Sequence, residues 1–130
     1  MGDNLEEGLR LHRPMGADAR REACLARLAR VRIGDPERCL ASYPHEFSGG
    51  MRQRIMLAAV MLLKPKLLIA DEPTTALDTL SQREVLDIMA ELASEAGAAV
   101  ILITHNLGPV ARYAERCVVL EKGRTVEAGP

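Results

Sequence analysis

The sequence predicts an α/β domain built on a mostly parallel sheet. Two short runs, 66–70 and 99–103, are almost entirely apolar, and amphipathic helical patterns lie before, between and after them. Strands that alternate with helices are typical of parallel sheets, whose inner strands are continuous apolar runs. The two runs are therefore expected to be strands buried on both faces of such a sheet. Such sheets bind ligands at the carboxyl ends of their strands, so the polar residues that directly follow the two runs are the first candidates for function.

Composition limits the kinds of function open to this chain. The 130 residues are 48% hydrophobic and 27% charged, which suits a domain with a core of its own. A net charge of −1 and an aromatic content of 2% argue against nucleic acid as a partner. No apolar run approaches the ~18 residues of a membrane span, and the acidic start is unlike a signal peptide, so we expect a cytosolic protein with three reduced cysteines.

Helical patterns occupy the first third of the chain. Leucines at 5, 9 and 11 fit the tail of a helix that begins outside this sequence and that Pro14 stops. A second helix should begin near Asp18 as its cap, with Cys24, Leu28 and Val31 turned inward. We expect the arginines between these positions to form a solvated face, and the segment 34–36 to break the chain.

The next helix should begin at Ser48, a preferred N-cap residue, and end before Lys64 and Pro65. Its apolar positions recur at helical spacing and predict one buried stripe, made of Met51, Ile55, Ala59 and Leu62. Two glycines, Gly49 and Gly50, stand in its first turn and cost about 1 kcal/mol each relative to alanine. One interpretation is simply a capped helix start. The other is that the missing Cβ atoms let an anion such as a phosphate approach the free N–H groups, which the helix dipole would favour.

Two adjacent acids, Asp71 and Glu72, end the first apolar run. Adjacent carboxylates repel, so keeping both ionised at a strand end calls for a cation or a chemical task. Successive strand residues point in different directions, so one acid can face Mg²⁺ and the other a water molecule. The alternative is a pair of solvated acids at the start of a loop.

The remaining elements follow the same alternation. A helix from about 79 or 81 to 96 should open on a capping box formed by Ser81 and Glu84 and stop at Gly97. The second apolar run ends next to His105, which is well placed to reach a ligand, although a lone histidine is more often structural. A short helix near 109–115 and a hairpin turning at Lys122 and Gly123 complete the chain.

Four segments together resemble the motifs of ATP-binding-cassette (ABC) ATPases, in family order. Residues 47–54 (Phe-Ser-Gly-Gly-Met-Arg-Gln-Arg) resemble the signature motif, and 67–73 (Leu-Leu-Ile-Ala-Asp-Glu-Pro) resemble the Walker B strand. Residues 76–78 (Ala-Leu-Asp) resemble the D-loop, and 103–105 (Ile-Thr-His) the switch histidine. Residues 43–46 (Tyr-Pro-His-Glu) and the methionine at 51 are further similar to the oligopeptide/dipeptide importer branch, which includes nickel importers.

The resemblance implies ATP and Mg²⁺ as cofactors and a role for each motif residue. Asp71 would hold Mg²⁺, Glu72 would orient and deprotonate the attacking water, and His105 would contact the γ-phosphate. Residues 48–51 (Ser48, Gly49, Gly50 and Met51) would bind the ATP of the opposite subunit in a head-to-tail dimer, and Asp78 would act across that interface. Further implied partners are transmembrane permease subunits and, through them, a solute-binding protein, which places the chain at the cytoplasmic face of the inner membrane.

Two departures from the family pattern stand out. Asn106 replaces the aspartate usual in the importer branch, and the sequence contains no Gly-Lys pair, hence no G-x-x-x-x-G-K-[ST] phosphate loop. The resemblance therefore implies the C-terminal part of a P-loop NTPase (RecA-like) ABC nucleotide-binding domain. We expect residues 1–64 to be a remnant of the helical subdomain and 65–130 to belong to the catalytic core. Without the phosphate-loop strand, 66–70 and 99–103 should have exposed edges or faces and make the chain aggregation-prone.

Three functional hypotheses remain open from the sequence. The first is a truncated ATPase of an importer of peptides or similar solutes, with this chain alone inactive. The second is an ABC ATPase with another transport substrate or a soluble task. The third is a non-catalytic half-domain that docks onto an intact ATPase and donates Ser48, Gly49 and Gly50 to its site.

Overall fold

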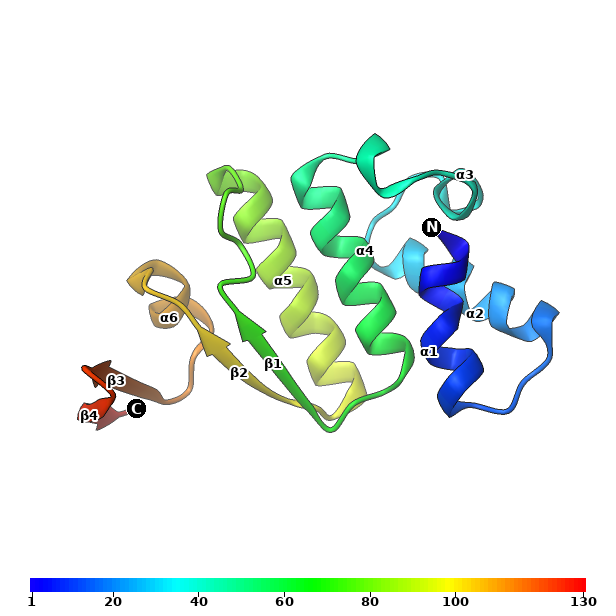
Figure 1. The fold of residues 1–130 in the computed structure, drawn as a ribbon. Helices are drawn as coiled ribbons and strands as arrows, with labels where there is room; N and C mark the ends of the chain where they lie inside the picture. The colour runs from blue at the N-terminus through cyan, green and yellow to red at the C-terminus, as the bar shows by residue number, and fades with distance from the viewer.

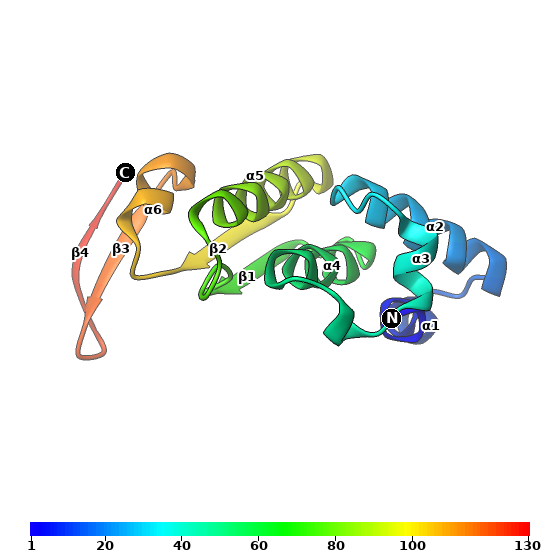
Figure 2. The same cartoon turned by 90° about the horizontal axis from the view of Figure 1, so that it is seen from above.

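The computed structural model describes all 130 residues, and it confirms the α/β class. The molecule is elongated, with three helices at its N-terminal end, two long helices and two strands in the middle, and a hairpin at the other end (Figures 1 and 2). No helix is both long enough and apolar enough to cross a membrane. The elements in chain order are α1 (Gly2–His12), α2 (Ala17–Arg30), α3 (Pro36–Ala41), a 3-10 turn (Pro44–Glu46), α4 (Gly49–Leu62), β1 (Leu67–Asp71), α5 (Thr79–Ala96), β2 (Ala99–Ile103), α6 (Leu107–Tyr113), β3 (Cys117–Glu121) and β4 (Arg124–Gly129).

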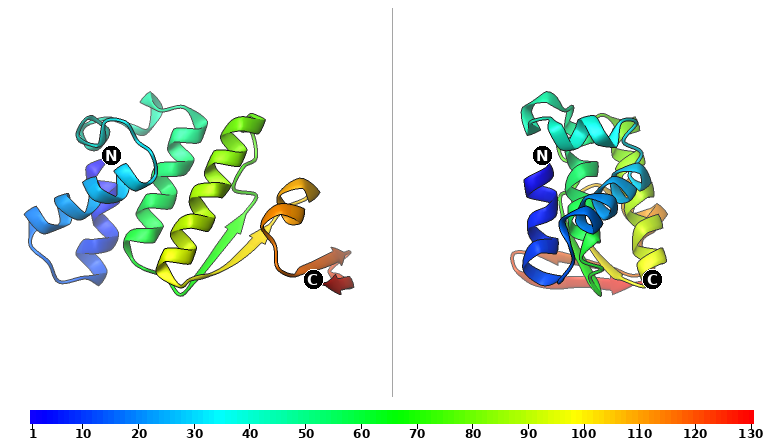
Figure 3. Two further views of the ribbon diagram at one scale, coloured as in Figure 1. Left: turned by 180° about the vertical axis from the view of Figure 1, so that it is seen from behind. Right: turned by 90° about the vertical axis from the view of Figure 1, so that its right-hand side faces the viewer.

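Strands β1 and β2 are parallel and in register from Leu67 opposite Ala99 to Asp71 opposite Ile103. Helices α4 and α5 lie against one face of this pair, whereas no element covers the other (Figures 1 and 3). Leu68 on the covered face is buried, but Ile69 is 60% exposed and Ile101 48% exposed. The expectation of a strand buried on both faces is therefore wrong for this structure, and the expectation of exposed strand faces is confirmed.

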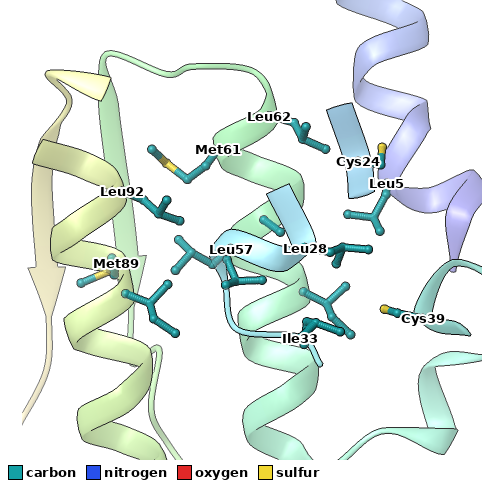
Figure 4. Packing of buried hydrophobic residues seen from close by; sticks show 14 of the residues in the cluster. Leu5, Cys24, Leu28, Ile33, Cys39, Leu57, Met61, Leu62, Met89 and Leu92 are labelled. Atoms are coloured by element: carbon teal, nitrogen blue, oxygen red, sulfur yellow. The ribbon is translucent and has the colours of Figure 1, made fainter. Parts of the chain in front are cut away.

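The hydrophobic core lies between the helices rather than on the sheet. A cluster of 18 buried residues joins α1, α2, α3, α4 and α5, with Leu28 of α2 and Met61 of α4 at most 1% exposed (Figure 4). Helix α4 buries Leu57, Ala58 and Met61 in addition to the predicted Ile55 and Leu62. It is packed between α2 on one side and α5 on the other, so its buried surface is wider than the single stripe predicted from the sequence.

Several helix starts and caps differ from the sequence prediction, because a residue other than the predicted one has the extended backbone conformation of a cap. Helix α1 begins at Gly2, inside the chain, and Gly16 rather than Asp18 occupies the N-cap of α2. Helix α5 is capped by the side chain of Asp78, so the predicted capping box at Ser81 does not form. The predicted stop at Gly97 is confirmed by its left-handed φ of 63°.

The C-terminal elements largely follow the prediction. Helix α6 begins at Leu107, two residues earlier than predicted, because the Asn106 side chain accepts a hydrogen bond from the Gly108 N–H. The β3–β4 hairpin forms with Lys122 and Gly123 at its turn, where both residues have positive φ.

The arginines of α2 are only partly a solvated face. Three of the four make ion pairs with glutamates of other helices, and these pairs are Arg20 with Glu6, Arg21 with Glu37, and Arg30 with Glu95. The helix thus uses its polar side for contacts to α1, α3 and α5, and the prediction of a purely solvent-facing side is wrong.

Candidate functional site

The carboxyl ends of β1 and β2 bring Glu72 and His105 into direct contact. His105 Nδ1 lies 2.7 Å from Glu72 Oε1, and the His105 backbone N–H donates to the same oxygen at 3.1 Å. The hydroxyl of Thr75 donates to Glu72 Oε2 at 3.0 Å. Both residues lie where the sequence predicts them, directly after neighbouring parallel strands. Because Asp71 at the end of β1 lies opposite Ile103 at the end of β2, the two side chains are close enough to form a hydrogen bond.

The backbone of Glu72 is unusual for a residue other than glycine. Its φ is 45°, in the left-handed region, and its N–H donates to the carbonyl of Ile103 at 2.9 Å. Such a conformation costs on the order of 1 kcal/mol or more and persists because surrounding contacts hold it. It directs the carboxylate away from the strand and toward the end of β2.

Hydrogen bonds set the charge of this carboxylate. The bond from the His105 side chain is the largest influence lowering the pKa of Glu72, and the bond from Thr75 adds to it, while partial desolvation opposes both. Glu72 is therefore ionised at neutral pH. An ionised carboxylate only accepts hydrogen bonds, so the proton in this contact belongs to Nδ1 of His105. Carboxylate oxygens offer about four lone-pair sites in all, and three are used here, which leaves Oε2 able to accept one further bond, for instance from water.

Asp71 is the last residue of β1 and its carboxylate is exposed. It borders a hollow of about 220 Å³ between α4, β1 and α5, together with Gln53 and Pro73. No group of three or more metal-ligating side chains exists in the structure. A single exposed carboxylate nonetheless fits Mg²⁺, which is commonly held by one or two carboxylates together with water and substrate phosphates.

The turn that opens α4 has the geometry of a capped helix start. The Ser48 hydroxyl accepts a hydrogen bond from the Met51 N–H at 3.3 Å, which confirms the predicted N-cap. The Met51 side chain is partly buried against the hydrophobic core. Of the predicted nucleotide-contacting residues, Ser48 therefore presents its side chain to solvent, and Met51 faces inward.

The two glycines of this turn pack closely against the start of α5, Gly49 against Leu77 just before the helix and Gly50 against Ser81 in its first turn. A Cβ on Gly49 would lie 3.1 Å from Leu77 Cδ2, and a Cβ on Gly50 would lie 3.3 Å from Ser81 Cβ. Both distances are shorter than ordinary contacts, so glycine allows this approach. Sequence reasoning missed the contact, and the only signal for it was the energetic cost of a glycine pair inside a helix.

Asp78 is the N-cap of α5 in this structure. Its Oδ1 accepts hydrogen bonds from the N–H groups of Leu80 and Ser81, and its Oδ2 accepts one from the Ser81 hydroxyl at 2.6 Å. The Ser81 side chain is the first cause of a lowered pKa for Asp78, followed by the backbone bonds. The residue has a structural role within the chain that the sequence did not reveal.

Two further surface features lie near these elements. Just before Ser48, the exposed rings of Tyr43 and His45 stack with centroids 5.7 Å apart. At the other end of α4, a groove of about 410 Å³ runs between α1, α2 and the ends of α4 and α5. Four cationic side chains line it beside its apolar residues, namely Arg13, Arg27, Arg30 and Lys64, and Arg30 is paired there with Glu95. Burial is the main cause of a lowered pKa for Arg27.

Fold and site together define a nucleotide-binding α/β domain: parallel strands end in a carboxylate pair and a histidine, beside a helix that opens on glycines. A family model described as "ABC transporter" matches residues 2–75, more than half of the chain, and the chain belongs to this family. A second model, described as "AAA domain, putative AbiEii toxin, Type IV TA system", matches residues 41–110.

Curated relatives match the whole chain. Proteins of Brucella melitensis and Brucella ovis, each named "Putative peptide import ATP-binding protein", are 50% identical over all 130 residues. One of Brucella abortus with the same description is 45% identical. The chain spans 38–39% of the length of these relatives.

Solved structures agree with the family. The ATP-binding cassette MJ0796, in a dimeric post-hydrolysis state bound to ADP and Pi, superposes with a TM-score of 0.82 at 29% identity, covering 98% of this chain and 54% of that one. The protein cbiO1 of Clostridium perfringens, described as part of the ABC transporter complex cbiONQ, superposes with a TM-score of 0.79 at 28% identity, covering 96% of this chain and 48% of that one.

Proposed function

We propose that this chain forms part of an ATP-hydrolysing subunit that powers an ABC importer of peptides or similar solutes. The observation that carries the proposal is the hydrogen-bonded pair of Glu72 and His105 at the carboxyl ends of two parallel strands. The names of the Brucella relatives support import of peptides as the task. Residues 1–64 then belong to a helical subdomain and 65–130 to a catalytic core.

Glu72 is proposed as the group that orients and activates the attacking water. The bonds from His105 and Thr75 fix the carboxylate in place and leave a lone pair on Oε2 for the water. The lowered pKa keeps the group in its basic, ionised form at neutral pH. Its strained backbone pre-positions it, so no reorganisation is needed when the substrate arrives.

His105 is proposed to report on the γ-phosphate of ATP. Its side chain is 84% exposed, and Nδ1 is committed to Glu72, so Nε2 is the ring atom that faces outward. For Nε2 to donate a hydrogen bond to a phosphate oxygen while Nδ1 also donates, the ring must carry a positive charge. A phosphate beside the ring would itself favour that charge.

Asp71 is proposed to hold Mg²⁺ through its exposed carboxylate, the ion supplying charge neutralisation for phosphates. Ser48, Gly49, Gly50 and Met51 are proposed to face the ATP of a second ATPase subunit, where the α4 N-terminus favours an anion. Asp78 would stand at the same dimer interface. The dimeric state of the superposed cassette MJ0796 supports this arrangement.

The groove between α1 and α2 is proposed as the contact to transmembrane permease subunits, which would place the protein at the cytoplasmic face of the membrane. Its cations, including Arg13 and Arg27, suit an acidic segment or a helix C-terminus of a partner. Co-purification of the longer protein with membrane subunits would test this. Recovery of the ATPase only without them would contradict it.

The decisive experiment uses the full-length Brucella melitensis relative with this chain grafted in place of the segment that it matches. Glu72→Gln keeps the size of the side chain and removes the base, so ATP turnover should fall by on the order of 100-fold or more while ATP affinity stays within a few-fold. Glu115→Gln, at an exposed glutamate far along the chain, is the matched control and should change neither quantity.

Turnover that survives Glu72→Gln would refute the role given to Glu72. The 130 residues alone contain no Gly-Lys pair, and we propose that by themselves they bind ATP weakly. Isothermal titration of the isolated chain tests this second point, and micromolar affinity would contradict it.

A further inference from the structure

Helix α6 directly follows the turn that contains His105, yet it packs against the rest of the molecule through few side chains. None of its seven residues is buried. Only Tyr113, in its last position, packs partly against the hydrophobic core. The position of α6 therefore depends strongly on a small number of polar contacts.

These contacts converge on one carboxylate in the middle of α5. The Tyr113 hydroxyl donates to Asp87 Oδ1 at 2.6 Å, and Arg112 Nη2 donates to the same oxygen at 3.4 Å. Arg83, one turn earlier on α5, lies 3.9 Å from Asp87 Oδ2. The Arg112 guanidinium also lies over the Tyr113 ring, 5.3 Å from its centre.

Tyr113 is the stronger of the two α6 anchors. Its hydrogen bond is short and partly buried, whereas the bond from Arg112 is long and its side chain is 50% exposed. The bond from Tyr113 is the largest influence lowering the pKa of Asp87. Burial, followed by the same bond, raises the pKa of Tyr113, so the donor keeps its proton at neutral pH.

The turn between β2 and α6 is held by its own side chains. The Thr104 hydroxyl oxygen accepts from the Asn106 N–H at 3.1 Å, and Asn106 Oδ1 accepts from the Gly108 N–H at 3.0 Å. His105 lies between these two residues and gives both its backbone N–H and Nδ1 to Glu72. A shift of α6 would therefore move the turn and with it both bonds to Glu72.

We propose that Tyr113 is a positioning residue for the Glu72–His105 pair, acting through its hydroxyl bond to Asp87, which fixes α6 and the turn at its start. The reading of this pair as catalytic rests on the proposed function, but the contact itself does not. Because Asp78 is the N-cap of α5, the same bond also connects the His105 turn to the helix that follows the predicted D-loop.

The test follows the His105 ring by nitrogen–proton correlation spectra of the 130-residue chain, without any nucleotide. In the unchanged chain the ring should show one tautomer, protonated at Nδ1, in contrast to the exposed His12. Tyr113→Phe keeps the aromatic ring and removes only the hydroxyl. It should move the His105 signals toward the mixture shown by His12 and speed exchange of the His105 amide by about three- to tenfold, the effect of losing one hydrogen bond.

Matched variants separate the hydroxyl bond from general loosening. Tyr43→Phe removes the hydroxyl of the exposed tyrosine and should leave His105 unchanged. Asp87→Asn keeps an oxygen acceptor for Tyr113 and should leave most of the His105 signature, whereas Asp87→Ala should reproduce Tyr113→Phe. His105 spectra unchanged in both Tyr113→Phe and Asp87→Ala would overturn the proposal. Because no ATP is involved, this failure is distinct from a failure of Glu72→Gln to abolish turnover.

Discussion

Replacing Gly50 by alanine should destabilise the chain, whereas the same change at Gly8 should stabilise it. Both glycines lie in helices, where alanine restricts the unfolded chain and is favoured by about 0.5–1 kcal/mol. At Gly8 the new Cβ would meet only the Leu63 side chain at 3.4 Å, an ordinary contact. We therefore expect the full gain at this position.

The balance is reversed at Gly50. The added Cβ would lie 3.3 Å from Ser81 Cβ and 3.4 Å from Ser81 Oγ. The Ser81 Cβ is bonded directly to the backbone of α5, and the Ser81 hydroxyl donates to Asp78 Oδ2 at 2.6 Å, so neither Ser81 atom moves away easily. Overpacking of this kind costs about 1–3 kcal/mol. Subtracting the gain from alanine leaves a net loss of about 1 kcal/mol at the middle of the two ranges, and of up to about 2.5 kcal/mol.

Urea unfolding followed by far-ultraviolet circular dichroism measures the difference. The two variants differ by the overpacking cost of about 1–3 kcal/mol. With a denaturant dependence of about 2 kcal/mol per molar urea, their midpoints should therefore differ by roughly 0.5–1.5 M. Adding Ser81→Gly to Gly50→Ala removes the Ser81 Cβ that the new alanine would contact. The double-mutant cycle of these two substitutions should give a coupling energy of about 1 kcal/mol. A rise of the midpoint in Gly50→Ala equal to that in Gly8→Ala would refute the packing argument and leave anion binding as the only reason for this glycine.

Two further outcomes follow from the surface. Ile101→Lys, on the uncovered face of β2, should reduce aggregation measured by light scattering and change the free energy of unfolding by less than about 1 kcal/mol. Leu68→Lys, on the covered face, should prevent folding. Equal aggregation of Ile101→Lys and the parent chain would contradict this. The pKa of Asp87 is lower in the folded chain than its ordinary value of about 3.9, so its contribution to stability is present above that value and is lost as the pH falls through the folded pKa. The urea midpoint should therefore drop on acidification, and less steeply in Tyr113→Phe; identical slopes would show that Tyr113 does not set this pKa.

Local signals in the sequence predicted the elements better than their ends. The apolar runs at 66–70 and 99–103 form the parallel strands β1 (Leu67–Asp71) and β2 (Ala99–Ile103), and Ser48 and Gly97 mark helix ends as predicted. Asp18 and Ser81 failed as caps because residues before them, Gly16 and Asp78, adopt the extended conformation that a cap requires. Capping depends on backbone conformation. Near a helix start the sequence often contains several residues that could cap it, and the sequence alone does not show which of them adopts that conformation.

In the candidate site, too, the sequence predicted which residues take part better than it predicted their detailed geometry. The order of the motifs predicted that Glu72 and His105 serve one site, and the structure shows that the two side chains are in contact at the ends of the parallel strands β1 and β2. The left-handed backbone of Glu72 and its bond to Thr75 were not predictable, because both depend on how the chain leaves the strand. The roles assigned to the site residues all stay predictions, and these residues are Ser48, Gly49, Gly50, Met51, Asp71, Glu72, Asp78 and His105.

The sequence by itself determined the α/β class, the family motifs and the residue types available for chemistry, because these depend on periodicity and on local composition. Only the tertiary structure decided that Gly50 lies against Ser81 and that Tyr113 bonds to Asp87, since each contact joins residues from different elements. No local pattern encodes such contacts, because they arise when helices pack at particular distances. The tertiary structure also left one face of β1 and β2 uncovered, a consequence of which elements this chain contributes to the sheet.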